Sequence, residues 1–363
     1  MANISYKLDD QALTFLERYL NNAAPTGFEA NGQRLWMEYL RPYVDSFITD
    51  SYGSAVGVIN PKADYKIVIE GHADEIGWTV NYISENGFIY VIRNGGSDHQ
   101  IATSKRVDIH TDNGLVSGVF GWPAIHTRDR NKETPPSTDN IFIDVGAQSG
   151  AEVESMGVHV GCPITYSDTF GILNGDKFVC RALDNRIGGF IIAEVARRFA
   201  ETGDKPGFGL YIVNSVQEEV GLRGAAMIAE TITPDAAIVT DVTHDTSTPM
   251  IEQTKAGAIK IGDGPAITHA PSVQNRLRQH IVDTAKRAGI PFQRNAKSPG
   301  TGTDTDSFAA SGRGVPSALV ALPLRYMHTT VEMVQRSDVE HVVELMYQSV
   351  ADIKIGEQFS YFE

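Results

Sequence analysis

YIVNSVQEEVGLRG, residues 211–224, is the stretch around which the rest of the chain is organised. An apolar run of β-forming residues ends at Val216, and two adjacent carboxylates, Glu218 and Glu219, come before a glycine turn. Open α/β sheets build their sites from polar side chains at the carboxyl ends of strands. Adjacent residues on an extended chain point to opposite sides, so one glutamate can bind a metal while the other handles protons. An isolated Glu-Glu pair is more often a solvated strand end than a functional site. Residues elsewhere in the chain are needed to choose between these two interpretations.

Length and composition indicate an ordinary soluble globular protein. The chain has 363 residues, a hydrophobic fraction of 42% and a formal net charge of −14. This length suits two domains, or one large domain with an insertion. The absence of a basic stripe argues against nucleic acid as a partner. The first ten residues, MANISYKLDD, do not resemble a signal peptide, and no apolar run approaches the ~20 residues that span a bilayer. Two cysteines, Cys162 and Cys180, favour a reduced, cytoplasmic protein.

Two flanking regions of the chain have an α/β pattern. Strands are predicted at 55–59, 66–70, 210–216, 236–240 and 317–322. Helices are predicted after a cap at Asp9 or Asp10, at 30–40, from Asp184, at 272–288, and from Ser337, with Glu340 completing a capping box.

Residues 76–168 have a different pattern. Short alternating segments recur at 87–92, 106–110, 114–120 and 141–145, and 111–114, TDNG, is a hairpin turn signal between two of them. We expect a small β-barrel or β-sandwich inserted into the α/β domain, with a mobile loop at 128–140. The α/β domain would then be discontinuous, made of residues 1–75 and 169–363.

Polar side chains follow four of the predicted α/β strands, those at 66–70, 210–216, 236–240 and 317–322. The set comprises His72 and Asp74, Glu218 and Glu219, Asp241 and His328, with Asp184 at the start of a helix. If the sheet is largely parallel, these residues gather at one edge. Imidazole and carboxylate without thiolate suit Zn²⁺, Co²⁺ or Mn²⁺ at a catalytic site, and a shared aspartate can bridge two ions.

Each of these residues also has a simpler explanation when it is taken alone. A lone histidine is more often structural or exposed, and Asp184 is a plausible helix cap. His72 and Asp74 share one face of an extended strand, so one can bind metal while the other orients the imidazole. Cys180 is interpreted as a small buried residue without a catalytic partner. Of the other histidines, His126 and His244 lie nearest to regions of interest.

The chain resembles the M42 metallo-aminopeptidases, which include tetrahedral (TET) aminopeptidases and bacterial glutamyl aminopeptidases. The segments that carry the resemblance occur in order over nearly the whole chain. They are GHADEIGWTV at 71–80, RALDNRIGG at 181–189, QEEVGLRGA at 217–225, VTDVTH at 239–244, GTDTDSF at 302–308 and LPLRYMHTTVE at 322–332.

This resemblance implies a role for each candidate residue. Asp184 would bridge two divalent metal ions, zinc first and cobalt or manganese as alternatives. His72 and Asp241 would complete the shell of one ion, and Glu219 and His328 that of the other. Glu218 would be the general base that moves protons to and from the attacking water and the leaving amine, and Asp74 would orient His72.

The resemblance also implies a substrate and an assembly. Peptides with a free N-terminus would lose their first residue, and the inserted β domain would assemble dimers into larger homo-oligomers, often dodecamers. One departure from the family's pattern is Ser247, where an aspartate often stands before Thr-Pro. It leaves the ligand positions intact and concerns the adjoining substrate pocket. The sequence does not define the preferred N-terminal residue, the metal used in the cell or the oligomer size.

Two other classes of function agree less well with the sequence. A metal-free endoglucanase would use two carboxylates across a glycosidic bond, but it gives the two histidines no purpose. Sugar clefts also need exposed aromatic side chains, and Trp36, Trp78 and Trp122 are scattered along the chain. A non-catalytic binding or assembly protein that keeps the fold would be expected to have lost a ligand position, and none is replaced.

Overall fold

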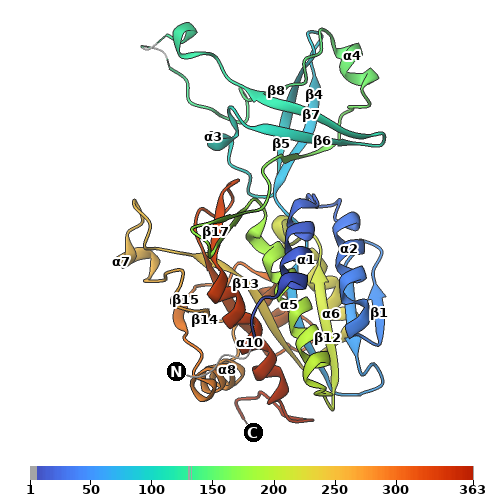
Figure 1. Cartoon of the computed structure of the whole chain (residues 1–363), viewed down its shortest axis with the longest axis vertical. Helices are drawn as coiled ribbons and strands as arrows, with labels where there is room; N and C mark the ends of the chain where they lie inside the picture. Colours follow the sequence, from blue (N-terminus) through green and yellow to red (C-terminus); the bar gives the residue numbers. More distant parts are fainter. Residues whose placement is uncertain (1–5, 130, 132, 363) are drawn as a thin grey trace.

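The computed structural model describes residues 6–129, 131 and 133–362. Figure 1 shows an elongated molecule with an α/β part below and a β part above. The expectation that the first ten residues do not form a signal peptide falls partly on residues 1–5, which lie outside the described residues. No helix within the described ranges is long and apolar enough to cross a membrane.

An eight-stranded mixed sheet forms the centre of the α/β part, in the order β1-β2-β12-β3-β13-β16-β14-β15. Its strands are β1 (Ser46–Thr49), β2 (Ala55–Ile59), β3 (Lys66–His72), β12 (Gly209–Ser215), β13 (Ala236–His244), β14 (Ala266–His269), β15 (Gln293–Ala296) and β16 (Ser317–Leu324). The four central strands, β12, β3, β13 and β16, are parallel to their neighbours among the four. The expected strands are therefore confirmed, and the carboxyl ends of these four meet at one edge.

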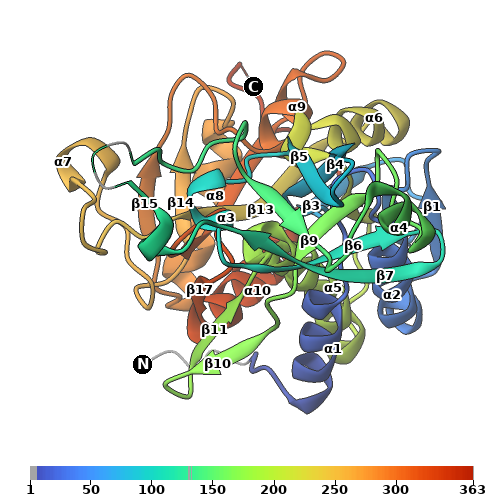
Figure 2. The same cartoon turned by 90° about the horizontal axis from the view of Figure 1, so that it is seen from above.

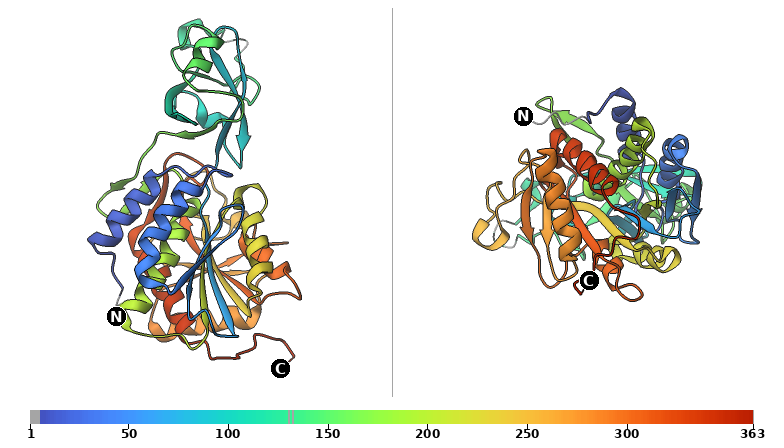
Figure 3. Two further views of the ribbon diagram at one scale, coloured as in Figure 1. Left: turned by 90° about the vertical axis from the view of Figure 1, so that its right-hand side faces the viewer. Right: turned by 90° about the horizontal axis from the view of Figure 1, so that it is seen from below.

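Helices cover both faces of this sheet (Figure 3). One layer consists of α1 (Asp10–Asn21), α2 (Ala30–Leu40), α5 (Leu183–Thr202), α8 (Asn275–Ala288) and α10 (Arg336–Ala351). The opposite face carries α6 (Arg223–Ile232) and α9 (Asp304–Ala310), which contact each other. The long α5 packs directly on the central strands and is buried along most of its length. A separate three-stranded sheet consists of β10 (Gly171–Leu173), β11 (Lys177–Cys180) and β17 (Glu332–Gln335).

The helix starts show what local sequence signals predict well and what they miss. Asp9 caps α1, because its side chain accepts a hydrogen bond from the Ala12 amide at 2.8 Å. The predicted capping box at Ser337 and Glu340 is wrong, since α10 begins at Arg336. The Glu340 carboxylate instead accepts a hydrogen bond from the Leu8 amide at 3.2 Å, so its partner comes from a segment distant in sequence.

The inserted region is a closed barrel in the strand order β4-β5-β8-β7-β6-β9, so the barrel alternative is the correct one. Its strands are β4 (Gly77–Ile83), β5 (Phe88–Asn94), β6 (Arg106–Thr111), β7 (Gly114–Gly121), β8 (Phe142–Asp144) and β9 (Pro163–Tyr166). The predicted hairpin is confirmed, because Thr111 pairs with Gly114. Trp78 and Phe120 lie in the barrel's own buried core, and Figure 2 shows the barrel strands from above, over the α/β part.

The loop at 128–140 is described only in part, since residues 130 and 132 lie outside the described ones. Its described residues contain neither helix nor strand. Two short helices, α3 (His99–Ala102) and α4 (Gly150–Ser155), complete the barrel region.

Candidate metal centre

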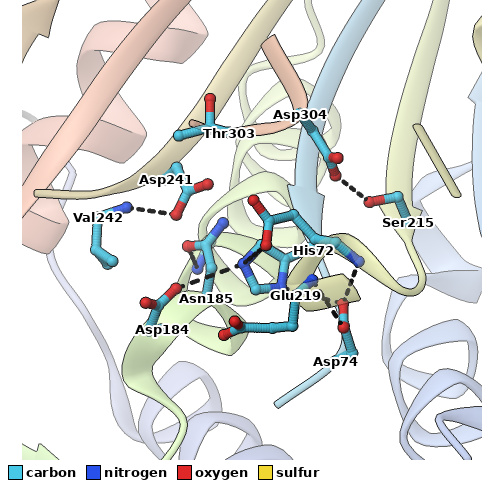
Figure 4. Close-up of polar contacts among 12 residues, drawn as sticks. His72, Asp74, Asp184, Asn185, Ser215, Glu219, Asp241, Val242, Thr303 and Asp304 are labelled. Atoms are coloured by element: carbon cyan, nitrogen blue, oxygen red, sulfur yellow. Dashed lines mark hydrogen bonds and ion pairs between the residues drawn. The ribbon is translucent and has the colours of Figure 1, made fainter. Parts of the chain in front are cut away.

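The parallel strands bring the sequence-predicted side chains to one edge of the sheet. Ser215 of β12 lies opposite His72 of β3, and Val239 of β13 lies opposite Glu70. Asp241 is therefore level with His72, each two residues beyond the paired Val239 and Glu70. Figure 4 shows His72, Asp184, Glu219 and Asp241 around one small space. The expectation that a parallel sheet gathers these residues is confirmed.

Asp184 lies at the centre of this cluster. Its Oδ1 is 3.4 Å from His72 Nε2, and its Oδ2 is 3.3 Å from His328 Nε2. His328 Nε2 is also 3.5 Å from Glu219 Oε1. Ligand-type atoms lie within 4.8 Å of one another in three groups: His72, Asp184 and Asp241; Asp184, Glu219 and His328; and His72, Glu218 and Glu219. The first two groups share Asp184, which is the geometry that a carboxylate between two cations requires.

Asp74 lies behind the cluster and organises it. Its Oδ1 is 3.3 Å from His72 Nδ1, which leaves Nε2 of that ring facing Asp184. The same carboxylate accepts the backbone amides of Glu218 at 3.0 Å and Glu219 at 3.2 Å. Thr26 donates its hydroxyl to Asp74 at 2.8 Å. Asp74 thus contacts the imidazole of His72 and accepts both amides of the turn that carries the glutamates.

The two glutamates are placed differently from the simple strand argument. They follow β12 in a 3₁₀ turn, η3 (Glu218–Val220), after Gln217 adopts a left-handed conformation with φ 57°. Both side chains therefore reach the cluster rather than opposite sides of an extended strand. The two glutamates differ in the histidine that each one contacts. Glu218 Oε2 is 3.8 Å from His72 Nε2, whereas Glu219 faces His328.

The local electrostatics show an excess of buried negative charge. Burial raises the pKa of Glu218 to about 10, with Asp241 among the carboxylates that add to the effect. Although burial favours the neutral imidazole, Asp184 and Glu219 raise the pKa of His328 to about 11. Glu219 Oε1 is buried without a hydrogen-bond donor. Imidazole and carboxylate groups that lack compensating positive charge fit divalent cations such as Zn²⁺, Co²⁺ or Mn²⁺.

A close contact between β3 and α5 allows Asp184 to approach His72. A Cβ atom built on Gly71 would lie only 2.7 Å from the Gly188 carbonyl carbon, so a side chain at 71 would push the helix away. Asp184 itself has non-helical torsions, φ −80° and ψ 110°, within the first turn of α5. This backbone turns its carboxylate towards the sheet edge rather than along the helix.

Glu332 is a residue of this site that the sequence analysis did not single out. Its Oε2 accepts the Asp184 amide at 2.9 Å, and its Oε1 accepts the His328 amide at 2.7 Å. The side chain is buried, and Asp184 lies 148 positions away in sequence. One carboxylate therefore connects the backbones of two candidate ligands. A sequence signal was present, since Glu332 closes the segment LPLRYMHTTVE four residues after His328.

We expect Glu332→Gln to weaken metal binding. The amide NH₂ would face one of the two backbone N–H donors, leaving it unpaired at a cost of about 1–3 kcal/mol. Zinc affinity, measured by calorimetric titration, should fall roughly 10- to 100-fold, as for other groups that orient ligands. Glu340→Gln is the matched control, because Glu340 is also buried and accepts a backbone amide but lies outside the cluster. Equal zinc affinities of the two variants would contradict this role.

The barrel region also contacts the cluster. A Cβ atom on Gly96 would lie 2.4 Å from His328 Nδ1, and one on Gly95 would lie 3.2 Å from Glu219 Cβ. The segment after β5 can pass this close only because it lacks side chains. These glycines were not predicted, and nothing local in sequence links them to residues more than a hundred positions away.

A cavity of about 360 Å³ opens beside the cluster, a size that suits a small ligand. Its lining includes Asp184, Glu218, Glu219, Asp241 and His328, together with Thr243, His244, Asn295, Lys297, Thr301 and Thr303. His244 therefore lies at the site, whereas His126 is exposed on the barrel. Ser247 is not part of the cavity wall; its amide donates to Asp245 at 2.7 Å.

The two cysteines do not belong to this chemistry. Both are free and buried. Burial raises the pKa of Cys180 to about 12, so this thiol stays protonated at neutral pH. This agrees with the interpretation of Cys180 as a small buried residue.

Comparison with known proteins identifies the family. The model of the M42 glutamyl aminopeptidase family matches residues 53–345. FrvX of Escherichia coli is 34% identical over 92% of this chain and 93% of its own length. The lysyl aminopeptidase of Pyrococcus furiosus is 30% identical, covering 93% of this chain and 96% of its own. A TET aminopeptidase structure from a marine-sediment Thaumarchaeota archaeon has a TM-score of 0.91 at 30% identity, covering 95% of this chain and 97% of its own. Ordered motifs, fold and relatives agree: this chain belongs to the M42 family of aminopeptidases and is a peptide hydrolase.

Proposed function

We propose that this aminopeptidase depends on two divalent metal ions and uses Glu218 as its general base. The observation that carries the proposal is the pair of ligand groups that share Asp184. His72 and Asp241 would complete one shell, and Glu219 and His328 the other. Zinc is the first candidate for both ions, with cobalt or manganese as alternatives.

Bound divalent ions would supply a water of lowered pKa and polarise the scissile carbonyl. Among the chain's own residues, Glu218 is the carboxylate left over once the two shells are assigned. It accepts the water proton at a carboxylate oxygen and later delivers a proton to the leaving amine. Burial raises the pKa of Glu218, which favours a carboxyl that can hold a proton, and bound cations would oppose this rise.

Asp74 completes this proposed mechanism without touching substrate. Its contact with His72 Nδ1 fixes which ring nitrogen faces the cations, and its two amide hydrogen bonds position Glu218 and Glu219. Peptides with a free N-terminus are the proposed substrates, and the cavity beside the cluster offers room for the first side chain.

Removal of metal should abolish activity. We expect the protein to hydrolyse an aminoacyl-p-nitroanilide, to lose that activity in excess chelator and to regain it when zinc or cobalt is added back. Carboxymethylcellulose, tested in parallel, should remain uncleaved under every condition. Full peptidase activity after exhaustive chelation, with no metal left by elemental analysis, would contradict the proposed cofactor.

The positions of the tryptophans argue against the endoglucanase alternative. Trp36 and Trp78 are completely buried, one in each hydrophobic core. Trp122 lies on the barrel and is absent from the wall of the cavity. No described tryptophan therefore offers the cavity a stacking surface for a sugar ring.

We further propose that residues 76–168 form an assembly domain and that the protein is a homo-oligomer, with a dodecamer as one candidate. Large apolar side chains are exposed on the barrel strands, including Tyr82, Ile92, Leu115 and Val119. Their number on one small domain supports a contact surface.

The two free cysteines support the cytoplasm as the proposed compartment.

A further inference from the structure

Lys297 lines the same cavity as the carboxylate cluster. It follows β15 directly, and its backbone amide donates to the His269 carbonyl at 2.9 Å, at the end of the neighbouring β14. The parallel pairing of β14 with β15 therefore positions this residue. Its side chain is half-buried and lines the cavity.

The Lys297 ammonium has no carboxylate within ion-pair distance among the residues that the structure describes. Each of the other half-buried lysines that the structure describes has an acceptor. Lys105 pairs with Asp168, Lys177 pairs with Asp176, and Lys66 donates to the Ile232 carbonyl. A cation that is partly removed from water is stabilised when an anion accompanies it. The unpaired cation on a substrate-sized cavity therefore indicates an anionic group on the ligand.

The groups around Lys297 favour the same kind of ligand. His244 lines the cavity too. Asn295 donates to the Thr243 hydroxyl at 3.1 Å, and the hydroxyls of Thr301 and Thr303 are 3.0 Å apart. Beside the candidate metal ligands, the cavity lining thus carries these polar groups and one full positive charge.

The loop after Lys297 holds this part of the cavity lining in shape. Asp306 accepts the amides of Thr301 at 3.0 Å and Gly302 at 2.9 Å. Its Oδ1 also accepts the Thr301 hydroxyl at 2.8 Å. A wall held by several hydrogen bonds loses little entropy when a ligand binds, which increases the contribution of one charged contact.

We propose that Lys297 is a specificity-determining residue whose ammonium binds a carboxylate of the peptide substrate. The proposal rests on the proposed aminopeptidase function. The carboxylate has two sources in a short peptide: the side chain of an N-terminal glutamate or aspartate, or the C-terminal carboxylate of a dipeptide. Lys297 does not touch the scissile bond and acts on substrate selection alone.

The test compares ratios of kcat/KM within each variant, using zinc-loaded protein. The first arm uses glutamyl-, leucyl- and lysyl-p-nitroanilide, and the second uses Leu-Gly and its C-terminal amide. We expect wild type to favour a carboxylate-bearing substrate by about 10- to 100-fold, the effect of one hydrogen bond to a charged group. Lys297→Met should bring that ratio close to one. Lys297→Glu should reverse the first arm, so that the lysyl substrate is preferred over the glutamyl one.

The arm that responds identifies the source of the carboxylate. A changed glutamyl-to-leucyl ratio assigns the side chain, and a changed ratio of Leu-Gly to its amide assigns the C-terminus; either supports the proposal. Lys286→Met is the matched control, since Lys286 is exposed on α8 away from the cavity, and it should leave both ratios as in wild type. Zinc content and circular dichroism verify that each variant is folded and loaded.

The outcomes separate this proposal from the one it rests on. If wild type cleaves the substrates but neither ratio changes in the Lys297 variants, the role of Lys297 is overturned and the aminopeptidase proposal stands. If zinc-loaded wild type cleaves no substrate of either arm, both proposals are overturned.

Discussion

Replacing Glu218 with glutamine is expected to lower kcat by about 10²- to 10⁴-fold, the usual contribution of a general base. Glutamine keeps the size of the side chain and removes its ability to accept and return a proton. Glu218 is buried within the cluster and belongs to neither of the two groups that share Asp184. Metal content should therefore remain near that of wild type, about two ions per chain as in other two-metal sites.

The measurement combines hydrolysis of an aminoacyl-p-nitroanilide with elemental analysis of the same sample. Glu38→Gln is a suitable control, because Glu38 is exposed on α2 and should retain wild-type kcat. A Glu218→Gln variant with wild-type kcat would remove Glu218 from the mechanism. A variant that loses metal as well would place Glu218 among the ligands. The structure makes this outcome a meaningful alternative, because Glu218 Oε2 lies 3.8 Å from His72 Nε2, a candidate ligand atom.

Replacing Asp184 with asparagine should impair both metal binding and turnover, because it removes the carboxylate that faces both histidines. An amide offers one oxygen instead of two and carries no charge, so it cannot serve two cations. We expect both ions to be bound weakly and kcat to fall by roughly 10³-fold or more, since several kcal/mol of transition-state stabilisation would be lost.

His328→Ala provides the comparison for Asp184→Asn. His328 belongs to only one of the two groups that share Asp184, so this variant should lose one ion and retain the other. Zinc should raise the melting temperature of wild type strongly, that of His328→Ala less and that of Asp184→Asn least, because ligands that bind only the folded state stabilise it. Unchanged metal content in Asp184→Asn would contradict the bridging role.

Much of the site was predictable because strand ends are visible in the sequence. The apolar runs before His72, Asp241 and His328 predict strands, and a parallel sheet places their carboxyl ends at one edge. The relation between Glu218 and Glu219 was predicted less well. An extended chain would place the two side chains on opposite sides, whereas Gln217 turns the backbone into η3 and both side chains reach the cluster.

Other features could not be predicted because they depend on contacts between distant segments. The predicted capping box does not form because the Glu340 carboxylate accepts a hydrogen bond from the Leu8 amide of the N-terminal segment. Glu332 gains its importance only when α5 and the His328 loop meet at its two oxygens. Likewise, the sequence does not show that Lys297 lies on the cavity wall without a carboxylate partner.

Hydrophobic periodicity and residue type, which are local properties, determined the α/β class, the inserted β region and the candidate ligands. The tertiary structure decided that the β region closes into a barrel, that Asp184 directs one oxygen to each histidine, and that a lysine faces the cavity. The physical reason is that strand register and helix packing set side-chain separations to within about an ångström. These separations result from the burial of the whole core, and no short stretch of sequence contains them.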